Sequence, residues 1–386
     1  MERKFFVRIL LICCIIGCWG CTQKKESADT VYYDKKYVKV IKEARRNIYF
    51  YVSGGSVPGG AIAVSINGEL VWSEGIGFAS RDLGARANRE TKFRVGYVSE
   101  LMTALACRNM AHAHILDLNE TVQRYYPEFP EKEYPVTLQN LLMHTSGIRQ
   151  PNADFSNTYS QGLEQETEKI FADSLLFMPG MYQYHSISNT NLLGMVMQKA
   201  AGESFAKVMN KWLLDTLKMK NTVPDNPLVT IKGRSNFFDR DIIAQVINAP
   251  FRDFRDKLPA EGYLSTAEDL VKMGNALLFD SALPPKVRKE MLEIPVMNDY
   301  NMEIANGLFY ETNLNNERFF MSRGNTTGGT AILYMHPENK VVVAWVANIS
   351  DLSSSEMQIF QIISDFTDFV NGEFKTAEEK RKEKQS

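Results

Sequence analysis

The sequence predicts an α+β fold, in which a mainly antiparallel sheet is flanked by helices and joined to a helical subdomain. The first observation is a hairpin signal, because Asn67-Gly68 separates the strand-like segments 61–66 and 69–74. Residues from about 99 to 280, in contrast, show mainly helical spacing of apolar side chains. Strand patterns then return at 307–312, 330–336 and 340–346. We therefore expect both ends of the chain to build one sheet around a helical insertion.

The composition is that of an ordinary folded protein. The 386 residues are 44% hydrophobic, 11% aromatic and 23% charged, which is enough material for a large core. The 44 basic and 46 acidic residues give a formal net charge of -2, so the chain has no overall field that would recruit a polyanion. No nucleic-acid partner is expected.

The first 21 residues differ in character from the rest. Arg3 and Lys4 precede the apolar run Phe5 to Gly20, which is shorter than the roughly 20 residues of a membrane span. This predicts an export signal, with an uncleaved membrane anchor as the alternative. The run contains Ile-Ile-Gly-Cys18 and is followed by Gly-Cys21, and both resemble the lipobox of bacterial lipoproteins. The resemblance implies cleavage before Cys18 or Cys21, lipidation of that residue, and a protein anchored to the bacterial cell envelope, facing the periplasm or the surface.

Helical spacing is also found on either side of the sheet-forming segments, at 33–51 and at 354–370. The last segment, 373–386, is charged and has no apolar face, so we expect a solvated and disordered tail. The predicted organisation is a signal peptide at 1–21, a tether with the first helix at 22–45, a folded domain at 46–372 and this tail.

Neither a metal nor a cofactor is indicated by sequence motifs. The body of the chain has no H-E-x-x-H and no paired C-x-x-C, which are common zinc patterns, and no G-x-S-x-G esterase elbow. Four of the five cysteines lie in the signal, so no disulfide framework is available. The fifth, Cys107, lies in an apolar helical stretch and is expected to be a small buried hydrophobic residue.

Several local strings follow one another along the chain: Val57-Pro-Gly-Gly-Ala-Ile-Ala-Val, Thr91-Lys-Phe-Arg-Val-Gly, Val136-Thr-Leu-Gln-Asn-Leu-Leu-Met-His-Thr-Ser-Gly and Tyr263-Leu-Ser-Thr-Ala-Glu-Asp-Leu. Together with the predicted layout, they resemble the serine β-lactamase-related family of class C β-lactamases, penicillin-binding proteins, DD-peptidases and esterases. The resemblance spans about residues 46 to 370. It implies the fold of that family and a cleft in which three motifs carry serine chemistry.

The first of these motifs, S-x-x-K, pairs a nucleophilic serine with a lysine base one helical turn later. In the register set by residues 93–96, this sequence has Tyr97 at the serine position and Glu100 at the lysine position. The one S-x-x-K in the chain is Ser204-Phe-Ala-Lys207, which is expected to be a surface lysine one turn after a capping serine. Ser99 is expected to be a helix-start residue.

The other two motifs are also altered. The second, Y-x-N, falls on His185-Ser-Ile without a gap, or on Ile187-Ser-Asn189 after a shift of two. The third, K-T-G or H-x-G, falls on Arg323-Gly-Asn325. Neither reading of the second motif keeps its tyrosine, and the third has an arginine at its first position.

The resemblance therefore implies a cleft lined by Tyr97, Glu100, His185, Asn189, Arg323 and Asn325. Because the first and third motifs converge in that fold, we expect the Glu100 carboxylate and the Arg323 guanidinium to lie within ion-pair or single-water reach. The alternative is that both side chains point to solvent. His144, in the His-Thr-Ser-Gly turn, is expected to fix a loop by a hydrogen bond.

Three functions remain open at this point. The first is a pseudoenzyme, whose cleft binds a peptidoglycan fragment or another small peptide-like or ester-like ligand without serine catalysis. The second is a hydrolase or transferase with a rebuilt Tyr97/Glu100/His185 site, in which the carboxylate polarises the phenol. The third is an ordinary esterase or peptidase of the family, for which the motif register above would be wrong.

Overall fold

The computed structural model describes residues 30–55, 57–150, 159–279, 282–297, 300–312 and 317–385. The predicted signal segment and both candidate lipidation sites, Cys18 and Cys21, lie outside these ranges. Within them, no helix has both the length and the apolar character that crossing a membrane requires.

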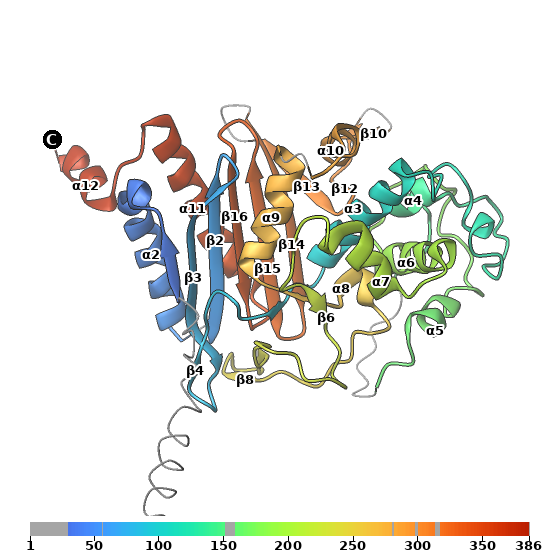
Figure 1. Cartoon of the computed structure of the whole chain (residues 1–386), viewed down its shortest axis with the longest axis horizontal. Helices are drawn as coiled ribbons and strands as arrows, with labels where there is room; N and C mark the ends of the chain where they lie inside the picture. The colour runs from blue at the N-terminus through green and yellow to red at the C-terminus, as the bar shows by residue number, and fades with distance from the viewer. Residues whose placement is uncertain are drawn as a thin grey trace, which may run out of the picture.

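One antiparallel sheet joins the two ends of the chain, as the strand patterns predict (Figure 1). Its order in space is β1-β3-β2-β16-β15-β14-β13-β12, with β4 paired to β3. The early strands are β1 (Val31–Tyr33), β2 (Gly59–Ile66), β3 (Glu69–Ser80) and β4 (Ala85–Arg86). The late strands are β12 (Ile304–Ala305), β13 (Leu308–Thr312), β14 (Arg318–Thr326), β15 (Gly329–His336) and β16 (Val341–Ala347). The two groups meet where β2 pairs with β16 along its length.

The hairpin between β2 and β3 forms at the predicted place. Asn67 and Gly68 have φ angles of 53° and 85°, so both occupy the left-handed region that a two-residue type I′ turn requires. Outside the hairpin, β1 is an addition to the prediction, because residues assigned to the tether pair with β3, from Val31 opposite Glu74 to Tyr33 opposite Trp72.

The two faces of the sheet carry different cores because side chains alternate along each strand. On β2, Ile62 and Val64 face α2 (Val38–Ser53) and α11 (Leu352–Asn371), the two helices that Figure 1 shows on one side of the sheet. Ala61 and Ala63 face the opposite side, where α9 (Ala267–Leu278) packs on β2 and β16. Small residues on this second face let the helix lie close to the sheet.

The helix predicted to start near Ser99 is α3 (Val98–His112), which is buried from Val98 to Met110. Cys107, within it, is fully buried, as expected. The helices of the subdomain are α4 (Leu138–Leu142), α5 (Leu163–Glu168), α6 (Ile187–Ala201), α7 (Phe205–Met209), η3 (Asn210–Leu214) and α8 (Leu258–Glu261). Of these, α6, α7, η3 and α8 contact α3, and α4 and α5 contact α6. Helix α3 therefore lies between the sheet and the helices of the subdomain.

Smaller elements connect these parts. They are η1 (Lys35–Tyr37), η2 (Val122–Arg124), α10 (Pro285–Leu292), the three-stranded sheet β5 (Phe93–Arg94), β9 (Tyr263–Ser265) and β6 (Val223–Pro224), and the pairs β7 (Phe238–Arg240) with β8 (Val246–Asn248) and β10 (Val296–Met297) with β11 (Tyr300–Asn301). The sheet that contains β5 matters for the site, because β5 leads directly into α3.

Within the charged tail at 373–386, for which the sequence predicts disorder, helix α12 covers Ala377–Gln385. Thr376 and Glu379 form a reciprocal cap at its start, since each side chain accepts a hydrogen bond from the backbone N–H of the other residue. Glu379 also pairs with Lys39 of α2 at 3.1 Å. Capping and charge pairs therefore support a helix that has no apolar face.

The start of α3 is held against β14 by a close backbone approach at Gly324. A Cβ atom on Gly324 would lie 2.0 Å from the Val95 carbonyl oxygen and 2.8 Å from the Tyr97 amide nitrogen. Real Cβ atoms do not come so near, so the strand and the helix start can touch only because residue 324 is glycine. This contact fixes where Tyr97 and the first turn of α3 lie.

Replacing Gly324 by alanine is therefore expected to separate β14 from α3. We predict that Gly324→Ala lowers the free energy of unfolding by about 1–3 kcal/mol, as overpacking of a dense core does. Gly54→Ala is the matched control, because its Cβ would lie no nearer than 3.4 Å to another atom and its φ of -61° suits alanine. The control should change stability by less than about 1 kcal/mol. Urea unfolding followed by circular dichroism measures both, and equal effects would contradict this account of the contact.

Candidate functional site

Tyr97 and Glu100 lie at the start of α3, one turn apart, as the first motif requires. Tyr97 occupies the N-cap position without a side-chain capping bond, and the backbone N–H of Glu100 donates to its carbonyl at 2.9 Å. Tyr97 is half-buried, whereas only 3% of Glu100 is exposed. The carboxylate is therefore directed into the protein.

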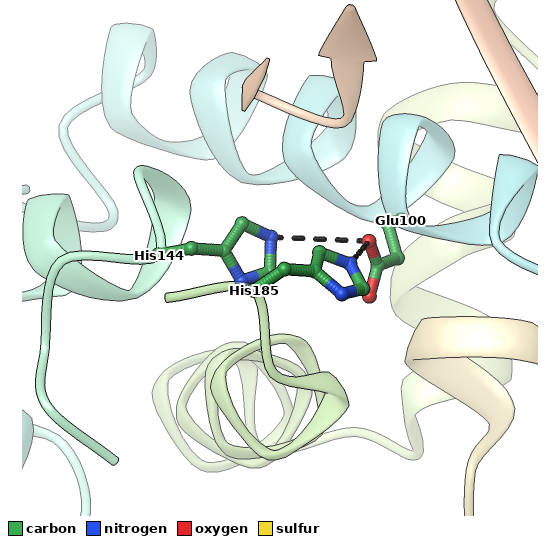
Figure 2. A group of neighbouring side chains, drawn as sticks. All are labelled: Glu100, His144 and His185. Atoms are coloured by element: carbon green, nitrogen blue, oxygen red, sulfur yellow. Dashed lines mark hydrogen bonds and ion pairs between the residues drawn. The ribbon is translucent and has the colours of Figure 1, made fainter. Parts of the chain in front are cut away.

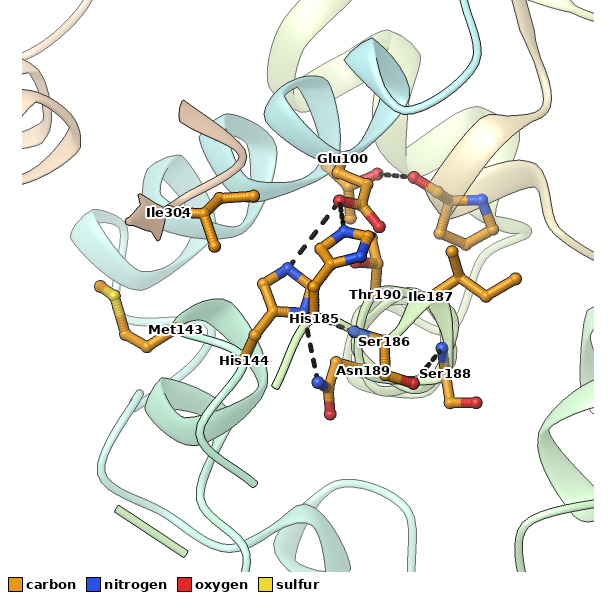
Figure 3. Close-up of polar contacts among 12 residues, drawn as sticks. Glu100, Met143, His144, His185, Ser186, Ile187, Ser188, Asn189, Thr190 and Ile304 are labelled. Carbon is orange, nitrogen blue, oxygen red and sulfur yellow. Dashed lines mark hydrogen bonds and ion pairs between the residues drawn. The ribbon is translucent and has the colours of Figure 1, made fainter. Parts of the chain in front are cut away.

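The buried carboxylate of Glu100 contacts two imidazoles and one hydroxyl (Figures 2 and 3). His185 Nε2 lies 2.8 Å from Glu100 Oε2, and His144 Nε2 lies 3.8 Å from the same oxygen. The Thr190 hydroxyl donates to the other oxygen, Oε1, at 3.2 Å. Glu100 is thus engaged with α6 and with the loop after α4.

The expected ion pair between Glu100 and Arg323 is absent, and that prediction is wrong. Arg323 Nη1 instead lies 2.8 Å from Glu356 Oε1 of α11, and its guanidinium stacks over the Phe309 ring at 4.5 Å. The half-buried Arg323 therefore belongs to the opposite side of the sheet from α3.

Strand alternation explains the error. Gly324 faces α3, so its neighbours Arg323 and Asn325 must face away. The Asn325 side chain accepts a hydrogen bond from the Thr330 hydroxyl at 3.1 Å, whereas the Thr326 hydroxyl, on the face of Gly324, donates to Glu261 of α8 at 2.9 Å.

We infer that the third motif is misaligned by one residue in the sequence-based register. If its glycine is the residue that faces α3, this glycine is Gly324 and the first position of the motif is the buried Ser322. A slip of one residue moves every side chain of a strand to the other face. Arg323 and Asn325 are therefore removed from the candidate site, and Thr326 with Glu261 is added.

His185 lies at the start of α6, where Ser186 is the N-cap and its hydroxyl accepts from the Ser188 backbone N–H at 3.2 Å. Its ring makes an edge contact with Tyr97, with centroids 5.6 Å apart. Since His185 meets both Tyr97 and Glu100, the ungapped reading of the second motif agrees with the geometry.

Asn189, the candidate from the shifted reading, is fully buried in α6 and supports the site from below (Figure 3). Its Nδ2 lies 3.2 Å from His144 Nδ1, and its Oδ1 accepts from the Ser146 hydroxyl at 2.6 Å. With no exposed surface, Asn189 positions His144 and does not line the cleft.

His144 makes the loop-fixing hydrogen bond that was expected from the sequence, and this prediction is confirmed. His144 Nδ1 accepts from the Ser186 backbone N–H at 3.3 Å. The role that the sequence did not predict is the contact of the other nitrogen with Glu100. The sequence feature that could have indicated this contact is the turn His144-Thr-Ser-Gly. In this turn His144 has a left-handed φ of 53°, and its side chain points toward α3 and α6.

The ionisation of the cluster follows from burial and from Glu100. Burial lowers the pKa of His144 to about 4, so this ring is neutral near pH 7. Burial also opposes the charged form of His185, but the hydrogen bond and the charge of Glu100 outweigh it and raise the pKa of His185. Glu100 therefore favours the charged form of His185, whereas burial keeps His144 neutral.

Tyr97 stays protonated under the same conditions. Burial, followed by the negative charges of Glu261 and Glu100, raises the pKa of its phenol to about 12. Burial also raises the pKa of Glu261. Burial and the two carboxyl groups therefore favour the protonated phenol.

No other serine takes over the nucleophile's place among the residues considered. Ser99 is fully buried, and its hydroxyl has no hydrogen-bond partner in the described part of the chain. Ser204 and Lys207 lie exposed at the start of α7, as expected for a surface pair.

A polar cavity of about 520 Å³ lies away from the imidazoles, between residues 159–169 and 252–257. Its walls carry cations and acids, including Lys169, Asp253, Asp256 and Lys257. Asp256 and Lys257 are close enough to Glu261 to influence its pKa, which places the cavity on the Glu261 side of the site.

Comparisons with known proteins agree with this architecture. A curated human relative, the mitochondrial serine beta-lactamase-like protein LACTB, is 27% identical over 314 residues, covering 63% of this chain and 57% of that protein. The protein flp of Staphylococcus aureus strain MW2 is 26% identical over 222 residues, covering 56% of this chain and 44% of flp. The matched region thus spans less than two thirds of the length of these relatives.

Solved structures share the fold at low identity. FmtA from Staphylococcus aureus superposes with a TM-score of 0.75 at 19% identity, covering 92% of this chain and 94% of FmtA. A class C beta-lactamase superposes with a TM-score of 0.71 at 18% identity, covering 86% of this chain and 98% of that enzyme. The family model described as Beta-lactamase matches residues 40–363, and the chain therefore belongs to the β-lactamase family.

Proposed function

We propose that this chain is a lipid-anchored protein of the bacterial cell envelope that binds a small ligand in the former catalytic cleft and does not form a serine acyl-enzyme. In this proposal the β-lactamase fold is retained as a binding scaffold, and the ligand is a peptidoglycan fragment or a related small peptide.

The contact between Glu100 and His185 is the observation that carries the proposal. In the S-x-x-K motif, the lysine amine takes the proton of the nucleophile. Here the residue at the lysine position is a carboxylate whose oxygens contact His185, His144 and Thr190. Tyr97 therefore has neither the primary alcohol of a serine nor the base that would activate one.

The chemistry of the surroundings supports a peptide-like ligand. Glu100 and Glu261 would favour a ligand that presents an amine or other hydrogen-bond donors. The neighbouring 520 Å³ cavity has both cationic and acidic walls, which suits a zwitterionic molecule. Small peptides carry both features.

A second candidate function rests on the same contact. An imidazole held by a carboxylate at 2.8 Å can take up and return a proton, as a general acid or base does. His185, in edge contact with Tyr97, would then serve a hydrolase or transferase with a rebuilt site. An ordinary serine enzyme of the family is less supported, because Ser99 is buried and the first motif lacks its lysine.

A fluorophosphonate serine probe tests the loss of serine chemistry. We predict no labelling of the purified protein above a heat-denatured control. Tyr97→Ser should also stay unlabelled, because Glu100 does not replace the lysine base. A serine β-lactamase labelled in parallel shows that the probe is active. Labelling of the unmodified chain at one serine would support the third hypothesis and overturn the proposed function.

If the probe is silent, hydrolysis of a panel of simple esters separates the two remaining candidates. The binding proposal expects no turnover above the denatured control. Turnover that falls at least tenfold in both Tyr97→Phe and His185→Gln would instead establish the rebuilt site.

The anchor is tested by metabolic labelling with a palmitate analogue in a bacterial host. We predict that the protein incorporates the lipid and that only one of the two single variants, Cys18→Ser or Cys21→Ser, loses it. The reason is that only one of these cysteines becomes the mature N-terminus. Cys107→Ser is the matched control and should keep the label. Labelling that survives the double variant Cys18→Ser/Cys21→Ser would contradict the lipoprotein assignment.

A further inference from the structure

Three side chains of metal-binding types meet at Glu100, His144 and His185 (Figure 2). Each offers one ligand atom, and these atoms all lie within 4.8 Å of one another. The side chains come from α3, from the loop after α4 and from the residue before the N-cap of α6. Because they lie in three separate segments, no short motif marks them, which is why the sequence analysis indicates no metal.

We propose that Glu100, His144 and His185 form a binding site for a first-row divalent transition metal, with Zn²⁺ as its reference ion. Two imidazoles and one carboxylate suit zinc, and His₂Glu is a ligand set used by zinc enzymes. Mg²⁺ and Ca²⁺ instead favour oxygen ligands. The ligand types therefore select the class of ion.

The spacing of the ligand atoms fits this coordination. A tetrahedral zinc ion with bonds of about 2.0–2.1 Å holds its ligand atoms about 3.3 Å apart. The distances from Glu100 Oε2 are 2.8 Å to His185 Nε2 and 3.8 Å to His144 Nε2. One distance is shorter than this spacing and the other is longer, and the ligand atoms of the two imidazoles lie within 4.8 Å of each other. Side-chain movements would therefore be needed to place all three atoms around one ion.

The charge of the site also favours a cation. Glu100 carries a buried carboxylate where the family motif has a lysine, and the cation expected to balance it, Arg323, pairs with Glu356 on the far side of the sheet. Glu261 adds a second buried carboxyl near Tyr97. A bound dication would compensate the negative charge that the imidazole of His185 balances in the metal-free protein.

Metal binding requires two changes in the hydrogen bonds around His144: the Asn189 amide must rotate, and the Ser186 N–H must move away from Nδ1, because a protonated Nδ1 no longer accepts a hydrogen bond. Its Nδ1 faces the Ser186 N–H and the Asn189 amide group, so the proton of the neutral ring lies on Nε2. To bind a metal through Nε2, the proton must move to Nδ1. A rotation of the Asn189 amide would then present Oδ1 to this proton and Nδ2 to the Ser146 hydroxyl, as outer-shell partners of metal-bound histidines do.

The three ligands leave a coordination position for water or for a group of the cleft ligand. His185 is the accessible member, with 36% of its side chain exposed, whereas His144 and Glu100 are buried. An ion can therefore enter from the Tyr97 side. The proposal concerns the same cleft as the proposed function but does not depend on the peptide-like ligand, because metal binding is measured without it.

The test is a Co²⁺ titration of the purified protein, prepared without a histidine tag and stripped with a chelator. We expect one equivalent to bind with a dissociation constant of about 10 µM or tighter. Binding should give intense visible absorption between about 500 and 650 nm, as tetrahedral Co²⁺ does, and Zn²⁺ should abolish this absorption. The spectrum of the wild-type protein tests the proposal even if a variant does not fold.

Variants assign the site. Glu100→Gln and His185→Gln should each weaken Co²⁺ binding at least tenfold, while His112→Gln, at the exposed end of α3, should leave it unchanged. Circular dichroism checks that each variant is folded. Absence of tetrahedral absorption in the wild-type protein, or binding that survives Glu100→Gln and His185→Gln, would overturn the proposal. Either result would leave the serine-probe experiment untouched, so the two proposals fail separately.

Discussion

The cleft of this protein is organised by one buried carboxylate. Glu100 is almost fully shielded from water, and an ionised carboxylate in that position is costly unless charged or hydrogen-bonding groups surround it. His185 at 2.8 Å, His144 at 3.8 Å and Thr190 at 3.2 Å supply those groups. Each comes from the helical subdomain, so satisfying this one charge ties α3 to α6 and to the loop after α4.

The backbone geometry of the cleft is kept, whereas the side chains at the motif positions differ from those of the family. Gly324 still lets β14 touch the start of α3, so the geometry that brings the first and third motifs together is kept. The side chains brought together differ from the family motif, because the residue at the lysine position is a carboxylate that contacts imidazoles and the residue at the serine position is a phenol. In our proposals this cleft binds a ligand and, through the three metal-ligand side chains, an ion.

The sequence predicts those features that depend on local chemistry. Asn67-Gly68 specifies its own turn, because both residues tolerate positive φ, and apolar periodicity identifies α3 and α11 without knowledge of their partners. The positions of Tyr97, Glu100 and His185 follow from motif spacing. The opening strand β1 and helix α12 are missed because their support comes from β3 and from the Lys39–Glu379 pair, respectively, and neither is visible locally.

The interactions of Arg323 and His144 could not be predicted in the same way. Arg323 is assigned to the wrong face because side chains alternate along a strand. An error of one residue in the motif register therefore moves a side chain from one face of the sheet to the other. His144 has an ordinary loop role in its own segment, and its second role exists only where α3 and α6 meet. The spacing of residues along the sequence does not predict this contact between separate segments.

A double-mutant cycle in urea unfolding tests most directly whether Glu100 depends on His185 and not on Arg323. The variants are Glu100→Gln, His185→Gln, Arg323→Gln and the two doubles that contain Glu100→Gln. The account predicts a coupling energy of about 1–3 kcal/mol between Glu100 and His185, and additive effects within about 0.5 kcal/mol for Glu100 and Arg323. Additivity of Glu100 with His185, or strong coupling with Arg323, would contradict it.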